Sequence, residues 1–134
     1  MKYLLDTDTC SFIMRQSSAM LMERFAGIAD NEVAMSVITQ GELKSGLARK
    51  PLAARLKARF DRLNVAIPTL DLPVAAATHY SMIRTHLEQK GLLIGSNDLW
   101  IASHALAANM RLVTNNVREF ERVPELRIEN WAAP

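Results

Sequence analysis

The chain has 134 residues, of which 49% are hydrophobic, and its mean hydropathy of +0.01 is typical of an ordinary globular protein. A net charge of +2 is too small to indicate nucleic-acid binding by itself, and the single cysteine excludes an internal disulfide framework and any zinc site built on several cysteines. No apolar run approaches the roughly 20 residues that span a bilayer, so we expect one cytoplasmic domain over residues 1–134 with no membrane segment.

The first half of the chain predicts two short strands and four helices. Apolar runs at residues 2–5 and from Val33 to Met35 have the length and composition of buried strands. Pro51 should end the third helix, and the third and fourth helices can then project as a hairpin over residues 36–63. The expected helices run from Asp8-Thr9 to Met14, from Ser17 or Ser18 to about Ala29, from Ser36 or Thr39 to about Arg49, and from Leu52 to Leu63.

The second half continues the alternation of strands and helices. Residues Val65 to Leu70 resemble a strand, in which Pro68 indicates an edge position or an irregular end. Because strands and helices alternate, the chain predicts an α/β fold with a parallel sheet of four or five short strands flanked by helices. The remaining elements are expected to be a helix from Pro73 to Gln89 or Lys90 stopped by Gly91, a helix from Ser96 to Asn109, and strands at Leu112–Thr114 and Leu126–Ile128.

Four carboxylates stand out by their positions relative to these elements: Asp6, Glu42, Asp98 and Glu119. Asp6 directly follows the first strand, Glu119 lies shortly after the strand at 112–114, and Asp98 lies in the first turn of its helix. In an open parallel sheet, ligand sites form outside the carboxyl ends of the strands. Hard cations such as Mg²⁺ prefer carboxylate oxygens and supply a hydroxide and charge neutralisation for phosphodiester hydrolysis. The acids therefore predict metal-dependent phosphodiester chemistry.

Two of these acids have ordinary structural explanations. Asp6 could cap the next helix, although Asp8 lies closer to the expected helix start. Glu42 could be a solvent-facing helical residue. Gly41 beside it costs about 1 kcal/mol relative to alanine inside a helix, and such a glycine often marks the close approach of another group.

Asp98 and Glu119 can be weighed in the same way. Asp98 could simply complement the positive end of the helix dipole. Its helix is apolar on most sides and therefore expected to be buried, so an acid at the helix start should face a pocket or cleft. Glu119 could pair with Arg118 or Arg122 on the surface.

Basic residues are concentrated in the segment from Lys44 to Arg62, which contains a single acid, Asp61. Most of these charges are explained by a solvated helix face. Some of them could instead follow a phosphate backbone. Lys44 and, further along the chain, Arg84 are the candidates for contact with phosphate.

Four motifs, in order, resemble the PIN-domain ribonucleases, and most closely the VapC toxins of bacterial toxin–antitoxin pairs. Any one motif is weak, but all four in this order and at this chain length are specific. The motifs are Leu4–Thr7, Ser36–Leu43, Ile94–Ala102 and Leu112–Phe120, and the resemblance extends to the closing segment Arg127–Trp131.

The resemblance implies a three-layer PIN-like fold, dependence on Mg²⁺ or Mn²⁺, and a homodimer. It implies a small cognate antitoxin whose tail covers the acidic site and through which the complex binds operator DNA. Asp6 and Asp98 would hold the metal, with Glu42 as the third core acid. The substrate would be RNA, as in toxins that cut transfer RNA in the anticodon loop.

The sequence departs from the family pattern at two positions. Asp8 stands where asparagine is common, and Asn116 stands where some members have the fourth acid. Glu119 matches the acid that a subgroup uses instead, so Glu119 is the candidate fourth acid, supported by Asn116 and Thr114.

Two other functions are compatible with parts of the pattern. A receiver-like signalling domain also combines a parallel sheet with an acidic Mg²⁺ pocket, and Asp71 could imitate its phosphorylated aspartate. That class, however, needs adjacent acids after the first strand and a lysine after a late strand, and neither feature is present. A catalytically inactive nucleic-acid-binding module is the third alternative, and its binding would survive chelation.

Overall fold

Five short parallel strands form the centre of the protein in a computed structural model that describes residues 1–50 and 52–134. The sheet order is β3-β2-β1-β4-β5, which places the first strand in the middle. Leu4 of this central strand lies opposite Ala34 on one side and Leu112 on the other. The strands are β1 (Tyr3–Leu5), β2 (Val33–Ser36), β3 (Thr69–Leu70), β4 (Arg111–Val113) and β5 (Ile128–Glu129).

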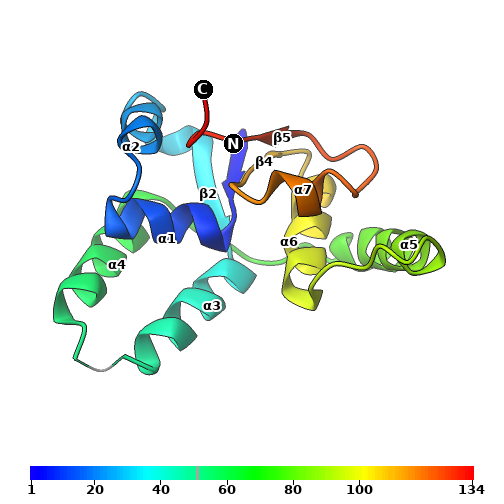
Figure 1. Cartoon of the computed structure of the whole chain (residues 1–134), viewed down its shortest axis with the longest axis horizontal. Coiled ribbons are helices and arrows are strands. Elements are labelled where there is room, and N and C mark those ends of the chain that lie inside the picture. Colours follow the sequence, from blue (N-terminus) through cyan, green and yellow to red (C-terminus); the bar gives the residue numbers. More distant parts are fainter. Residues whose placement is uncertain (51) are drawn as a thin grey trace.

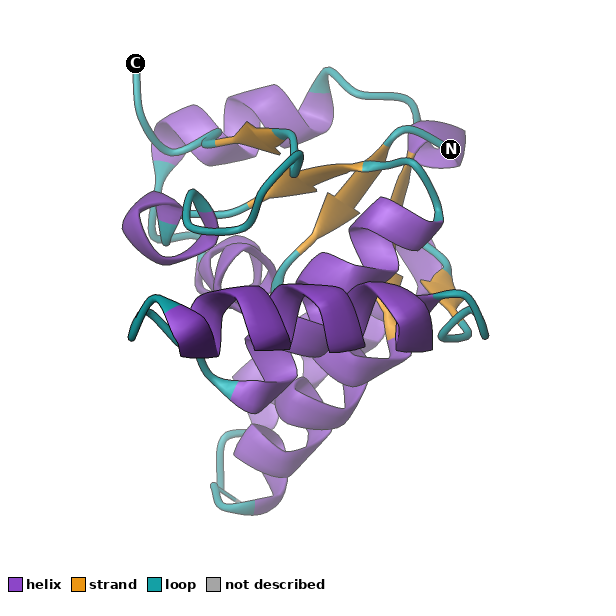
Figure 2. Cartoon of the chain, turned by 90° about the vertical axis from the view of Figure 1, so that its right-hand side faces the viewer, coloured by secondary structure: helices purple, strands orange, loops and turns teal. Residues whose placement is uncertain are grey.

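Helices cover both faces of the sheet, which gives the expected three layers (Figures 1 and 2). On one face pack α1, α2 and α4, and on the other pack α5 and α6. The helices are α1 (Thr7–Arg15), α2 (Ala19–Ala26), α3 (Val37–Ala48), α4 (Ala54–Ala66), α5 (Ala76–Gln89), α6 (Ser96–Ala107) and α7 (Val117–Phe120), with a 3-10 turn, η1, at Asp30–Glu32.

The alternation of side chains along the strands separates the two hydrophobic cores. Successive residues of a strand point to opposite faces of the sheet, so Leu5 joins the core under α1, α2 and α4, whereas Leu4 joins the core under α5 and α6. Both leucines are fully buried. Trp131, also fully buried, closes the first core from the C-terminal segment.

The helices α3 and α4 form the expected hairpin, which extends away from the sheet in Figure 1. Ser36 caps α3 by accepting a hydrogen bond from the Ile38 amide at 3.1 Å. The predicted helix stop at Pro51 lies outside the described residues. In the part of the chain that the structure describes, no helix is long and apolar enough to cross a membrane.

Several predicted boundaries differ from the structure by a few residues, among them the last strand, which was expected at Leu126–Ile128 and lies at Ile128–Glu129. Three of the wrong boundaries have identifiable physical reasons. The expected strand at Val65–Leu70 is divided: Val65 and Ala66 end α4, and only Thr69–Leu70 forms a strand and pairs with β2. The helix continues this far because Phe60, Leu63 and Ile67 follow a helical spacing and are buried. The helix expected from Pro73 begins at Ala76 instead, after a turn in which the Pro73 carbonyl accepts from the Ala76 amide.

The third wrong boundary concerns the cap of α1. Asp6, rather than Asp8, caps this helix, and its carboxylate accepts a hydrogen bond from the Thr9 amide at 2.8 Å. The helix therefore begins immediately after β1 with no intervening loop.

Candidate active site

The order of the strands reverses beside β1, and this reversal creates the crevice in which the acids lie. The chain proceeds from β1 to β2 and β3 on one side of the sheet, and then crosses through α5 and α6 to β4 on the other side. Ligands bind at such a switch point, outside the carboxyl ends of the strands. Asp6 directly follows β1 and Thr114 directly follows β4, so both residues lie at this point.

Asp6 is almost completely buried, with 3% of its surface exposed. Burial raises the pKa of the Asp6 carboxyl to about 6, although hydrogen bonds from Thr114 and Thr9 lower it in part. Asp6 therefore both caps α1 and lies in the crevice. Thr114, expected as a supporting residue, is fully buried, and its hydroxyl also accepts from the Asn116 amide at 2.9 Å.

Glu42 faces the crevice from α3 and is held there by two neutral donors. Its Oε1 accepts from the Thr7 hydroxyl at 2.5 Å, and its Oε2 accepts from the Asn97 side-chain amide at 3.3 Å. The alternative of a solvent-facing helical glutamate therefore does not hold. The close approach expected at Gly41 was wrong, because a Cβ there would meet open space.

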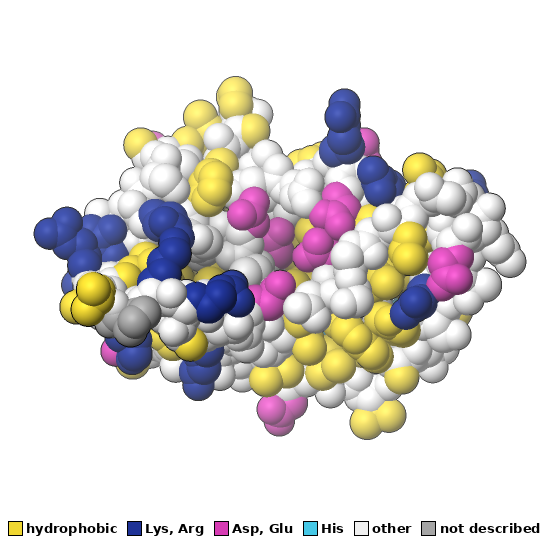
Figure 3. All heavy atoms as spheres, turned by 60° about the horizontal axis from the view of Figure 1, so that its bottom comes forward, with side chains coloured by type: hydrophobic (Ala, Val, Ile, Leu, Met, Phe, Trp, Pro, Cys, Tyr) yellow, Lys and Arg dark blue, Asp and Glu magenta, His cyan; other side chains and the backbone are white. Residues whose placement is uncertain are grey.

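Asp98 lies in the first turn of α6, where the other acids surround it. Burial, then the charges of Glu119, Glu42 and Asp6, raise the pKa of the Asp98 carboxyl to about 7. This opposes the helix dipole, which would favour the ionised form. The four predicted acids, from distant parts of the sequence, therefore form one cluster, which Figure 3 shows as the acidic patch in a hollow at the centre of the molecule.

Glu119 reaches Asp98 from α7, a one-turn helix. Its Oε1 accepts from the Gly95 amide at 3.2 Å, and its Oε2 accepts from the Asn116 side chain. The alternative of a surface ion pair with Arg118 or Arg122 is absent from the described residues. Glu119 therefore belongs to the cluster, and Asn116 orients it.

The cluster has the donor chemistry of a site for Mg²⁺ or Mn²⁺. All of its candidate ligands are oxygen atoms, and in the described ranges no lysine or arginine forms an ion pair with any of its carboxylates. Within residues 1–50 and 52–134, no group of three Asp, Glu, His or Cys side chains is already spaced closely enough to hold one metal ion. A divalent cation would offset the like-charge repulsion among these carboxylates. The oxygen donors therefore fit such a cation by their chemistry, although no three of the described carboxylates already lie at ligand spacing.

A pocket of about 500 Å³ opens over the acids. Asp6, Glu42 and Asp98 line it, and so do Arg15, Arg49 and Lys50, which we call its basic wall. The structure adds four residues to those predicted for the site: Thr7, Asn97, Arg15 and Arg49. The first two adjoin Asp6 and Asp98 in the chain, which is the only signal that pointed to them.

The two predicted phosphate contacts lie away from these acids. Lys44 lines a different pocket, between α3 and α4. Arg84 is on α5, where it donates to Glu88 at 2.7 Å and to the Tyr80 hydroxyl at 2.8 Å. The structure does not bring either residue into the acidic crevice.

A parallel sheet between helices, with four acids gathered at its switch point, defines the class as an α/β domain with an acidic ligand site. The family model for the PIN domain matches residues 3–126, and the chain belongs to this family.

Two curated relatives match almost the whole chain. A protein of Rickettsia felis named Ribonuclease VapC2 is 38% identical over 132 residues, which cover 98% of each chain. A protein of Shigella flexneri named tRNA(fMet)-specific endonuclease VapC is 37% identical, covering 98% of this chain and 99% of the relative.

A solved structure shares both the sequence and the fold. The crystal structure of VapBC2 from Rickettsia felis, bound to a DNA fragment from its promoter, contains a chain that is 37% identical. It superposes with a TM-score of 0.90, covering 98% of this chain and 99% of the other. The predicted α/β fold and the resemblance to PIN domains are thus confirmed.

Proposed function

We propose that this chain is a VapC-type toxin, an endoribonuclease that uses Mg²⁺ or Mn²⁺ to hydrolyse RNA phosphodiester bonds. The observation that carries the proposal is the gathering of Asp6, Glu42, Asp98 and Glu119, without basic partners among the described residues, at the switch point of the sheet. The full-length similarity to proteins named ribonucleases supports it.

The residues of the cluster divide into two roles in the proposed reaction. Asp6 and Asp98 would hold the cation, which when bound lowers the pKa of water and neutralises phosphate charge. Glu42 and Glu119 would accept hydrogen bonds from the attacking water and orient it. Each is already fixed by neutral donors, Glu42 by Thr7 and Asn97 and Glu119 by Asn116 and the Gly95 amide. Because water attacks rather than the neighbouring 2′-hydroxyl, the products should end in a 3′-hydroxyl and a 5′-phosphate.

The relatives suggest the substrate and the partners. The similarity to a tRNA(fMet)-specific endonuclease supports transfer RNA as the substrate, and we propose that the cut falls in the anticodon loop. The similarity to a chain of VapBC2 bound to promoter DNA supports a cognate antitoxin through which the complex binds operator DNA. A homodimer in the cytoplasm completes the proposal.

The strand order removes the receiver-like alternative. In the doubly wound order of receivers, 2-1-3-4-5, the third strand lies beside the first. Here β3 is an edge strand beside β2, and β4 occupies the position next to β1. Asp71, which follows β3, therefore does not lie beside Asp6.

Cleavage of transfer RNA tests the proposal directly. Wild-type protein should cleave end-labelled initiator transfer RNA in Mg²⁺, should lose cleavage in a chelator and should regain it when Mg²⁺ is returned. Asp71→Asn is a matched control, because it removes an exposed carboxylate away from the crevice, and it should cleave normally. RNA binding that persists in the chelator, with no cleavage of any RNA in Mg²⁺, would instead identify an inactive binding module.

Expression in cells tests the toxin assignment separately. Expressing this chain alone should arrest growth of a related host, and co-expression of the small protein encoded beside it should reverse the arrest. Harmless accumulation of active wild-type protein would contradict the assignment.

A further inference from the structure

Two arginines line the pocket that contains the acids. Arg15 projects from the last turn of α1, and Arg49 lies at the C-terminal end of α3. Both side chains are exposed. Figure 3 shows Lys and Arg side chains to one side of the acidic hollow, on the same face of the molecule. The pocket therefore has one acidic part and one basic part.

Each guanidinium is held by a serine one turn earlier in its own helix. Arg15 Nε donates to Ser11 Oγ at 3.2 Å, and Arg49 Nη1 donates to Ser45 Oγ at 3.1 Å. Each serine hydroxyl accepts from one N–H of its guanidinium and carries no charge. The other N–H groups and the full positive charge therefore stay available for a ligand. The two side chains are thus partly ordered before any ligand binds.

Neither arginine is neutralised by a carboxylate within residues 1–50 and 52–134, although acids line the same pocket. The contrast with other basic residues is clear. Lys57 pairs with Asp61 at 2.7 Å on α4, and Arg59 donates to the Met14 carbonyl at 3.2 Å. The basic segment from Lys44 to Arg62 therefore contains residues with structural partners and a smaller set that faces the pocket.

We propose that Arg15 and Arg49 bind backbone phosphates of the RNA that flank the scissile bond. The inference rests on the proposed function and adds the surface that positions the substrate. A guanidinium fork matches the oxygens of a phosphate in a bidentate arrangement. With the cleaved phosphate at the acids, neighbouring phosphates of the same strand extend along the pocket to the basic wall. The arginines also offset the repulsion between the acidic cluster and a polyanion.

The proposal is tested by RNA binding at several salt concentrations. Fluorescence anisotropy with labelled transfer RNA would use the full chain carrying Asp98→Asn, so that the RNA stays intact. Arg15→Ala and Arg49→Ala should each weaken binding roughly tenfold. Each should also reduce the slope of log K against log salt by about 0.7, the value for one phosphate contact in single-stranded nucleic acid.

Lys44→Ala is the matched control, because it removes the same charge from α3 on the side away from the acids. It should leave both affinity and salt slope close to the starting values. Arg15→Lys and Arg49→Lys keep the positive charge but lose the bidentate guanidinium geometry. These variants should therefore bind RNA more weakly than the starting protein, with an unchanged salt slope. Thermal melts would confirm that every variant is folded, and the lysine variants provide the test if an alanine variant is not.

Two outcomes would overturn the inference. The first is arginine variants that bind RNA like Lys44→Ala. The second is an unchanged affinity for RNA with a loss of affinity for the antitoxin, which would assign the arginines to the protein partner. Wild-type cleavage of RNA in either case leaves the proposed function standing, whereas a wild-type chain that cleaves no RNA contradicts that function itself.

Discussion

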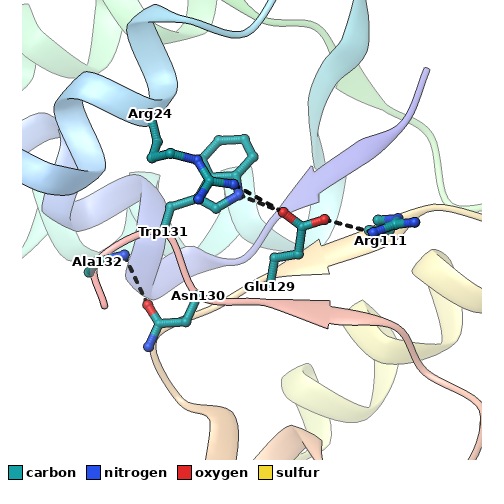
Figure 4. Close-up of polar contacts among 6 residues, drawn as sticks. All are labelled: Arg24, Arg111, Glu129, Asn130, Trp131 and Ala132. Atoms are coloured by element: carbon teal, nitrogen blue, oxygen red, sulfur yellow. Dashed lines mark hydrogen bonds and ion pairs between the residues drawn. The ribbon is translucent and has the colours of Figure 1, made fainter. Parts of the chain in front are cut away.

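Two groups of charged residues in this molecule are built in opposite ways. In the first, at the end of β5, Glu129 accepts hydrogen bonds from Trp131 Nε1 at 3.0 Å, Arg111 Nη1 at 3.0 Å and Arg24 Nη2 at 3.3 Å (Figure 4). In the second, the acidic pocket, the carboxylates accept hydrogen bonds from neutral hydroxyl and amide groups and lie close to one another. In the first group the carboxylate is paired with positive charges, and in the second no carboxylate is, among the described residues; we call them the balanced and the unbalanced group.

The pKa values of the two groups move in opposite directions. Burial raises the pKa of the Glu129 carboxyl, but hydrogen bonds from Trp131 and Arg111, with the nearby positive charges, outweigh burial and leave it below its ordinary value. Burial and the neighbouring acids raise the pKa of Asp98 to about 7. A balanced carboxylate stabilises the fold, whereas an unbalanced cluster is available for a ligand.

The balanced group fastens the C-terminal segment to the sheet. The indole of Trp131 meets the Tyr3 ring edge-on, with centroids 5.1 Å apart, and the Arg24 guanidinium lies 5.5 Å from the indole centre. These contacts join α2, β1 and the segment after β5. We therefore expect changes here to affect stability and changes in the pocket to affect catalysis.

Asp98→Asn should have the largest effect. We expect RNA cleavage to fall by at least roughly 1000-fold, because one metal ligand and one charge are lost. The free energy of unfolding should stay the same or rise, because repulsion from Glu119, Glu42 and Asp6 is relieved. Single-turnover cleavage and urea unfolding would measure both, and retained cleavage by pure variant protein would refute the metal site.

Glu119→Gln should have the next largest effect. We expect Mg²⁺-dependent cleavage to fall roughly 10- to 100-fold, which is typical when a group supporting a metal site is lost. Asn116→Ala should reduce cleavage less, because Asn116 acts by orienting Glu119. Cleavage rates over a Mg²⁺ titration would rank the two variants, and the reverse ranking would leave a site of three acids.

Glu129→Ala should separate stability from activity. Losing the carboxylate leaves the Trp131 N–H and the half-buried Arg111 without their partner, which should cost about 1–3 kcal/mol of unfolding free energy. Cleavage well below the melting temperature should not change. Glu88→Ala is the control, because the exposed Arg84–Glu88 pair contributes little. An equal loss in the two variants would contradict the comparison.

The pH dependence of stability should show a smaller effect of the same residue. Because the folded pKa of Glu129 is lowered, its contribution is complete above its unfolded pKa, ordinarily 4.5, and is lost as pH falls through the folded value. The difference in unfolding free energy between wild type and Glu129→Gln should therefore be largest near neutral pH and narrow below 4.5. A difference that widens with acid would contradict this assignment.

The gathering of the acids was predictable from the sequence because it follows from topology. Asp6 comes directly after a buried apolar run, and the carboxyl ends of parallel strands share one edge. For Asp6 only the strand had to be recognised, whereas Asp98 also required the start of its helix to be recognised. The local appearance of Val65–Leu70 was misleading, because β-branched residues suggest a strand while the burial of Phe60 and Leu63 depends on helical spacing across a longer window.

The basic wall and the hydrogen-bonding neighbours were not predictable. Lys44 and Arg49 lie five residues apart on α3, yet they face different pockets, and the packing of the α3–α4 hairpin decides which of them faces the acids. Glu119 was predicted to face the acids, but the hydrogen bond that it accepts from the Gly95 amide joins segments 24 residues apart, and no local pattern indicates it. Long side chains and short turns take their direction from tertiary packing, which local pattern does not encode.

Diffraction from Mn²⁺-soaked crystals tests the central claim most directly. Mn²⁺ scatters anomalously and shares the oxygen-ligand preference of Mg²⁺. We predict an anomalous peak between Asp6 and Asp98 in the wild-type protein, no peak at Glu129, and loss of the first peak in Asp98→Asn. Well-ordered crystals of the wild-type chain with no Mn²⁺ at the acids, or with Mn²⁺ bound equally in Asp98→Asn, would contradict the account.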